Sequence, residues 1–129
     1  MNGRFALDTN IVIALWEDEL SLRRRFDEAS ATFVPSIVLG ELYYGAVKSF
    51  RLEANLARVD EFAATNTVLS CDAGTAQHYG RIRADLSKKG RPIPDNDVWI
   101  AALAQQYGLT LVTRDEHFKA VGGLSVERW

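Results

Sequence analysis

The sequence has little that would tie the chain to an oxidising compartment or to a membrane. Its 129 residues include one cysteine, Cys71, which cannot form an intramolecular disulfide and is typical of a reducing compartment. Asp8 follows Met1 too closely for a signal-peptide core to develop. No apolar run approaches the roughly 20 residues of a membrane-spanning helix. We therefore expect a cytoplasmic protein without a membrane partner.

An excess of charge of either sign is also missing. The chain has 15 Lys and Arg against 17 Asp and Glu, a formal net charge of -2, which excludes a global attraction to nucleic acid. A local basic patch beside a local acidic pocket remains compatible with this balance. Prolines number only 3, and no repeat, low-complexity segment or linker interrupts the chain. We expect a single domain over residues 1–129.

Short apolar runs alternate with longer helical patterns along the whole chain. Strands are predicted over 5–7, 33–34, 67–69, 109–113 and 124–126. Helices are predicted to about Trp16 and over 20–31, 36–50, 51–64, 73–89 and 96–107. We expect Thr9 and Asn10 to cap the first helix and Asp95 the last. Strands separated by helices indicate the α/β class, with a parallel sheet covered on both faces.

Two aspartates directly follow predicted strands. Asp8 ends the run Phe5–Leu7, and Asp115 comes two residues after Thr113 at the end of the fourth strand. Taken singly, Asp8 can be explained as a helix cap and Asp115 as a turn residue, without any metal. If the first and fourth strands are neighbours at a topological switch, however, both side chains emerge side by side where ligands bind in such sheets.

Two further acids lie on apolar helix faces. Glu41 shares its face with Ile37, Val38 and Leu42, and Asp97 precedes the wholly apolar segment 98–104. Either each acid reaches water from the edge of its face, or it needs a cation or a hydrogen-bond network. For Asp97 a favourable interaction with the helix dipole is a further explanation. Several converging carboxylates repel one another, and Mg²⁺ or Mn²⁺ is the usual counter-ion for an oxygen-only set.

The acids belong to four short segments whose order along the chain is distinctive. These are Leu7–Asn10, Ser36–Leu42, Asn96–Ala102 and Leu111–Asp115, followed by Phe118 and the terminal Trp129. In this combination the chain resembles, essentially from end to end, the PIN-domain ribonucleases, and most closely the VapC toxins of bacterial toxin–antitoxin pairs.

The resemblance implies a fold and a set of site residues. The fold is a three-layer α/β/α sandwich on a mainly parallel sheet of about five strands. The acidic quartet implied by the family is Asp8, Glu41, Asp97 and Asp115, with Asp8 and Asp97 as the principal ligands of Mg²⁺ or Mn²⁺. The implied pocket is further lined by Thr9, Asn10 and Thr113. Asp95 is an additional acid to which the resemblance assigns no role.

The resemblance also implies an activity and partners. The activity is endonucleolytic cleavage of RNA, often structured RNA such as tRNA, by water that the metal activates and that Glu41 or Asp115 orients. The partners are a cognate antitoxin and a second copy of the toxin in a homodimer. Arg114 beside Asp115 either binds a substrate phosphate or pairs with an acid. The basic stretch 81–91 either guides an RNA backbone or forms a solvated helix face.

Three other functions remain open from the sequence. A phosphatase or phosphotransferase with Asp8 as nucleophile is disfavoured, because haloacid-dehalogenase-like enzymes have a second acid two residues on and this chain has Asn10 there. A metal-free ribonuclease would use His78 and His117 as an acid–base pair and leave a cyclic phosphate. A catalytically silent module would use the same acids only to hold a structural cation or a basic partner.

Overall fold

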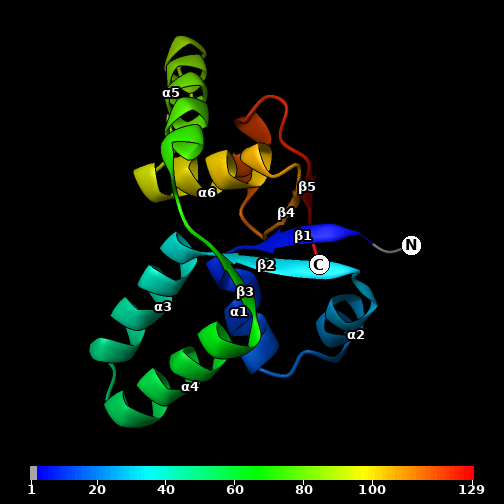
Figure 1. Cartoon of the computed structure of the whole chain (residues 1–129), viewed down its shortest axis with the longest axis vertical. Coiled ribbons are helices and arrows are strands. Elements are labelled where there is room, and N and C mark those ends of the chain that lie inside the picture. Colours follow the sequence, from blue (N-terminus) through cyan, green and yellow to red (C-terminus); the bar gives the residue numbers. More distant parts are fainter. Residues whose placement is uncertain (1–2) are drawn as a thin grey trace.

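The centre of the molecule is an all-parallel sheet of five strands. The structure, a computed structural model, describes residues 3–129. The strand order is β3-β2-β1-β4-β5 (Figure 1). The strands are β1 (Arg4–Leu7), β2 (Ala31–Pro35), β3 (Thr67–Leu69), β4 (Thr110–Val112) and β5 (Val126–Glu127). The predicted α/β class and parallel sheet are confirmed.

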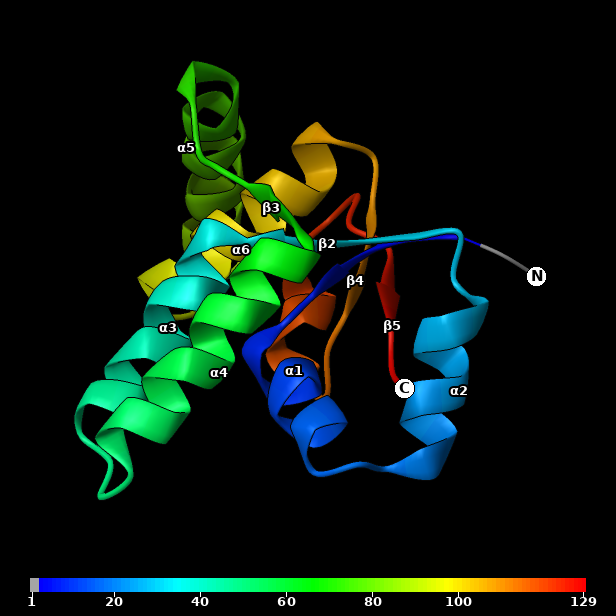
Figure 2. The same ribbon diagram turned by 60° about the horizontal axis from the view of Figure 1, so that its bottom comes forward.

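Helices cover both faces of this sheet. They are α1 (Thr9–Trp16), α2 (Leu20–Glu28), α3 (Ser36–Val47), α4 (Leu52–Thr65), α5 (Ala73–Lys88) and α6 (Asp95–Gln106), with a 3₁₀ turn, η1 (Glu116–Ala120). Helices α1 to α4 lie on one side of the sheet and α5 and α6 on the other (Figures 1 and 2). Right-handed crossovers explain this division, because the chain moves outward from β1 to β3 and then returns to β4. Within residues 3–129, no helix has the length and apolarity needed to cross a membrane.

The core is built on the central strands and on α6. Ala6 and Leu7 of β1 have no exposed surface, as expected for a strand covered on both faces. The same is true of residues 100–104 in α6, which explains why this helix carries no polar face. Gly108 ends the α6 segment in the left-handed region, at φ +64°, a conformation that glycine adopts without strain. The two elements that carry Asp8 and Asp97 are therefore anchored in the core.

The second helix is shorter than its sequence pattern predicts. It ends at Glu28, not at Ala31. The N–H groups of Ser30 and Ala31 donate to the carbonyl of Gly3, at 3.0 and 3.2 Å. Pairing with the start of β1 therefore wins over helix propensity here, and Ala31 begins β2.

Two predicted caps are also wrong. Helix α1 is capped by Asp8, whose Oδ1 accepts the N–H of Thr9 at 2.8 Å, so Thr9 is already helical. Helix α6 begins at Asp95 itself, after Pro94, and no side chain caps it. The proline fixes its own φ and needs no N–H partner, which makes the residue after it a ready first helical position. The carboxylate of Asp95 is consequently free to bind elsewhere.

Candidate active site

The candidate site lies between β1 and β4, where the order in which strands are added to the sheet reverses. Leu7 pairs with Val112 across these strands, and the N–H of Asp8 donates to the Val112 carbonyl at 3.0 Å. Asp8 and Thr113 therefore leave adjacent strands at the same carboxyl edge. The adjacency predicted from the sequence is confirmed.

Asp8 is the most deeply buried acid of the site, with 5% of its surface exposed. Its Oδ2 accepts the hydroxyl of Thr113 at 2.7 Å and lies 3.5 Å from the amide nitrogen of Asn10. The Asn10 amide oxygen accepts the N–H of Arg114 at 3.2 Å. These bonds hold the Asp8 carboxylate in one orientation and tie it to the loop after β4.

Glu41 joins the site through two neutral side chains. The hydroxyl of Thr9 donates to Glu41 Oε1, while the N–H of Thr9 donates to Asp8. The amide of Asn96 donates to Glu41 Oε2 at 3.3 Å. Thr9 and Asn96 thus link the acids of α1, α3 and α6, which explains how Glu41 is accommodated on an otherwise apolar helix face.

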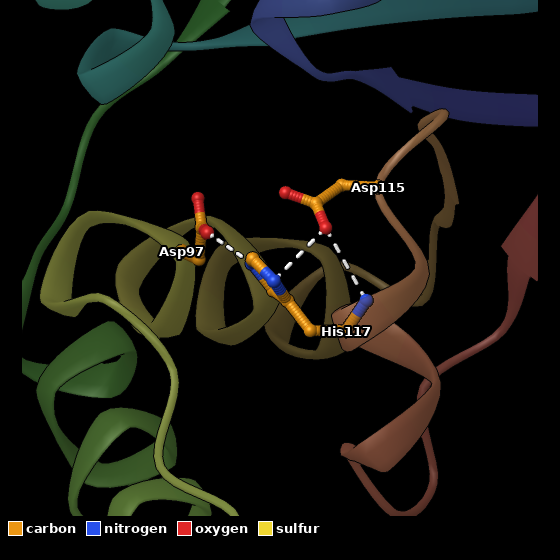
Figure 3. Close-up of side chains that lie close together, drawn as sticks. All are labelled: Asp97, Asp115 and His117. Carbon is orange, nitrogen blue, oxygen red and sulfur yellow. Dashed lines mark hydrogen bonds and ion pairs between the residues drawn. The ribbon is translucent and has the colours of Figure 1, made fainter.

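The remaining two acids are bridged by His117 (Figure 3). The ring Nε2 lies 2.7 Å from Asp97 Oδ2, and Nδ1 lies 2.9 Å from Asp115 Oδ1. Each ring nitrogen therefore contacts one of the two carboxylates. The N–H of Asp115 donates to the Thr113 hydroxyl at 3.0 Å, which connects this pair back to Asp8 through one side chain. Ligand atoms of Asp97, Asp115 and His117 all lie within 4.8 Å of one another, close enough for one metal ion.

All four acids of the predicted quartet face one cleft of about 600 Å³, and Asp95 is a fifth. Most of the lining residues are polar, and they come from the end of β1, from α1 and α3, from the start of α6 and from the loop after β4. These residues are Asp8, Thr9, Asn10, Ile13, Glu41, Pro94, Asp95, Asn96, Asp97 and Asp115. The cleft is open and is not filled by apolar side chains, so it has room for a cation.

Two of these carboxyl groups are perturbed by their surroundings. Burial raises the pKa of Asp8, and the charges of Asp97 and Glu41 raise it further, against the hydrogen bonds from Thr113 and the Thr9 N–H. Burial also raises the pKa of Asp97, with Asp115 and Glu41 acting in the same direction and His117 opposing them. A positive charge placed in the cleft would therefore stabilise the ionised forms of Asp8 and Asp97 and lower both pKa values.

Arg114 does not point its guanidinium into this cleft. Its Nη2 and Nη1 donate to Glu19 Oε1 and Oε2, at 2.7 and 3.2 Å, and its Nε donates to the Trp129 carbonyl at 3.3 Å. The sequence left two roles open for Arg114, and the structure shows it paired with an acid, Glu19. The predicted role of Arg114 in binding substrate phosphate stays a prediction.

Two residues of the site were not selected from the sequence as part of the acidic cluster. Asn96 was treated only as the start of a helix, although it stands between two acids in that helix's first turn. His117 was considered only as half of an acid–base pair with His78. In the structure His78 lies on α5, with Nδ1 3.3 Å from Gln105 Oε1, well apart from the contacts of His117. The position of His117 two residues after Asp115 was the available signal.

Comparison with known proteins places this geometry in a family. The family model described as "PIN domain" matches residues 5–124. The chain is 41% identical over 129 residues to a protein named ribonuclease VapC2 from Haemophilus influenzae, covering 98% of both chains. It is 42% identical to a tRNA(fMet)-specific endonuclease VapC from Shigella flexneri, again covering 98% of both.

Solved structures agree with this placement. The crystal structure of DNA-bound VapBC from Salmonella typhimurium includes a chain that superposes with a TM-score of 0.91 at 39% identity, covering 100% of this chain and 99% of that one. The DNA-bound VapBC2 structure from Rickettsia felis gives the same TM-score at 32% identity, covering 98% of each. Fold, site position and sequence thus lead to one assignment: the chain belongs to the PIN-domain family, within its VapC ribonucleases.

Proposed function

We propose that the protein is a divalent-metal-dependent endoribonuclease and the toxin of a VapBC-type toxin–antitoxin pair. The observation that carries the proposal is the convergence of five carboxylates on one open cleft. Identity of about two residues in five to proteins named ribonuclease or tRNA endonuclease supports the same reaction. Because one of these relatives is named for tRNA(fMet), we propose initiator tRNA as the substrate to test.

The donor set fits a hard divalent cation. Carboxylate oxygens are the ligands that Mg²⁺ and Mn²⁺ prefer. Burial, with the neighbouring acids acting in the same direction, raises the pKa values of Asp8 and Asp97, and a bound cation would lower them again. Asp8 and Asp97 would hold the ion, with Asp115 and Glu41 completing the set. When bound, a divalent cation lowers the pKa of water and neutralises charge on the scissile phosphate.

Side chains of the cleft orient the attacking water and take up its proton. Glu41 or Asp115 orients the attacking water and accepts its proton. The water oxygen forms a bond to phosphorus while the bond from phosphorus to the 3′ oxygen breaks. The leaving 3′ oxygen takes up a proton from solvent, and the phosphate stays on the 5′ oxygen. The products are a 5′-phosphate and a 3′-hydroxyl. Thr9 and Thr113 keep the carboxylates in place by their hydrogen bonds, and Asn10 orders the loop beside them.

The test is cleavage of an initiator tRNA(fMet) transcript by the purified protein with Mg²⁺ or Mn²⁺ and with EDTA. Asp8→Asn should lower the cleavage rate by about 10³-fold, whereas Asp18→Asn, an exposed acid paired with Arg23, should leave it unchanged. A 5′-phosphate product and inhibition by EDTA are expected. A cyclic phosphate with full activity in EDTA would instead establish the metal-free mechanism. A divalent-dependent rise in melting temperature without any cleavage would establish the silent module.

We also propose that the protein assembles with an antitoxin and with a second copy of itself. Both structural relatives named above are VapBC complexes. Apolar side chains on α3 and at its end are exposed, among them Tyr44, Val47 and Phe50, and such a patch is commonly covered by a partner. Co-purification with the product of an adjacent small gene, and loss of cleavage in that complex, test the first assembly. Light scattering of the isolated toxin tests the second.

A further inference from the structure

We propose that Arg83 of α5 is a substrate-binding residue that receives an RNA phosphate at the rim of the acidic cleft. This inference rests on the proposed ribonuclease function and adds a residue outside the acidic quartet. The cleft must accept a polyanion, yet its lining contains five carboxylates and no lysine or arginine. A cation near the cleft is therefore needed to hold the backbone on either side of the scissile bond.

Arg83 is the residue that the fold brings to this position. Its Nη1 donates to Asp95 Oδ1 at 2.8 Å, and Asp95 is one of the lining residues in the first turn of α6. Among the ion pairs of residues 3–129, Arg83 is the arginine or lysine that pairs with a cleft-lining acid. Its partner Asp95 precedes Asp97 by two residues in the first turn of α6.

The orientation of the guanidinium is set by an aromatic column. Tyr79 stacks on Trp99 with ring centroids 4.1 Å apart and planes inclined by 21°. The Arg83 Cζ lies 5.9 Å from the centroid of the Tyr79 ring, and Nη1 also donates to the Tyr79 hydroxyl. The same hydroxyl donates to Asp95 at 3.0 Å. Arg83 is thus pre-positioned before any RNA arrives.

The remaining donors of Arg83 are available to a ligand. Both of its hydrogen bonds within the described chain use Nη1, whereas Nε and Nη2 bond to no residue from 3 to 129. A guanidinium presents these two groups as a parallel fork that matches two phosphate oxygens. The side chain is 59% exposed, and that of Asp95 is 64% exposed. An ion pair this open contributes little to stability, so replacement of Arg83 should leave the fold intact.

This arrangement also assigns a role to Asp95, which the family resemblance leaves without one. Asp95 does not cap α6, and its carboxylate instead holds Arg83 beside the cleft. Arg114, the other arginine close to the acids, is engaged by Glu19 and by the terminal carbonyl. Arg83, whose Nε and Nη2 make no bond within residues 3–129, is therefore the arginine that we assign to a phosphate contact at this rim.

The test measures binding of labelled initiator tRNA(fMet) to the Asp8→Asn protein, in which cleavage should be slowed about 10³-fold, over a series of NaCl concentrations at fixed Mg²⁺. Arg83→Gln in this background should weaken binding about tenfold at low salt. It should also reduce the slope of log K against log salt by about 0.7 to 1, the signature of one lost phosphate contact. Arg83→Lys keeps the charge and should keep the slope while losing part of the affinity.

Arg23→Gln is the matched control, because Arg23 forms an exposed ion pair with Asp18 on another part of the surface. In the active protein, Arg83→Gln should raise KM and leave kcat nearly unchanged, whereas a disturbance of Asp97 would lower kcat. Equal salt slopes for the Arg83→Gln and Arg23→Gln proteins would overturn the assignment of Arg83 and leave the nuclease standing. Failure of the Asp8→Asn protein to bind tRNA, together with no cleavage by the unmodified protein, would overturn both proposals.

Discussion

The hydroxyl of Thr113 holds two parts of the site together, so Thr113→Val is the most informative single change. The residue is 2% exposed, and its hydroxyl donates to Asp8 Oδ2 at 2.7 Å and accepts the N–H of Asp115 at 3.0 Å. Valine has nearly the same shape, so the change removes the polar group without opening a large cavity.

The expected cost follows from these two bonds. A hydrogen bond to an ionised carboxylate contributes about 1.5–3 kcal/mol and a neutral one about 1 kcal/mol, which together give about 3 kcal/mol. An unfolding entropy of roughly 2.1 cal/mol/K per residue makes this a fall in melting temperature of about 10 °C for 129 residues. The larger contribution needs an ionised Asp8. The difference between the two proteins should therefore narrow as the pH falls and Asp8 is protonated.

The assay is thermal unfolding of both proteins in EDTA, followed by circular dichroism across a range of pH. Thr65→Val is the control, because the Thr65 hydroxyl makes an exposed bond to the Glu61 carbonyl and its loss should change the melting temperature by less than about 2 °C. A fall of less than about 3 °C for Thr113→Val, or a gap that does not change with pH, would refute the reasoning.

Three further changes test other contacts of the site. The pKa values of Asp8 and Asp97 are raised in the folded state, so the folded protein binds more protons than the unfolded chain at pH values between the ordinary carboxyl pKa and the raised one. In EDTA, the free energy of unfolding should fall as the pH rises through this range. Asp8→Asn should make the melting temperature depend less on pH, and an unchanged dependence would contradict the prediction. Glu19→Gln weakens the fork that holds Arg114 and the loop after β4, so kcat/KM for tRNA should fall about tenfold with little change in melting temperature; a loss of the fold instead would show that the pair is structural. His117→Ala removes the side chain that bridges Asp97 and Asp115. Added Mg²⁺ should then raise the melting temperature of the variant more than that of the unmodified protein. An equal rise would show that the imidazole ring and the ion do not act on the same two carboxylates.

The fold was largely predictable because its signals are local. Short apolar runs such as Phe5–Leu7 mark the buried strands, and the wholly apolar segment 98–104 marks the buried helix. The end of α2 was not predictable in this way. Residues 30 and 31 pair with the Gly3 carbonyl, and that partner is distant in the sequence. Tertiary hydrogen bonds decided this boundary, and a single sequence contains no direct sign of them.

The candidate site was predictable to the level of its acids and not to the level of their contacts. Charge on an apolar face singled out Glu41 and Asp97 because burial of an unsatisfied carboxylate is costly. Neutral partners such as Asn96 carry no such signal, since an exposed amide is ordinary anywhere. Asp95 was taken for a cap because acids are common there, and its bond to Arg83 depends on how α5 packs against α6. The packing of two helices was thus the missing information.

The position of the cleft between β1 and β4 has a consequence for how the protein is made. Asp8 is synthesised before α1 to α6, whereas Thr113 and Asp115 are synthesised after them. Since β4 must pair with β1 before these side chains can meet, the acids cannot converge while the chain still lacks β4. Chains that end before β4 should therefore lack the cluster of acids on which the proposed cleavage of RNA depends.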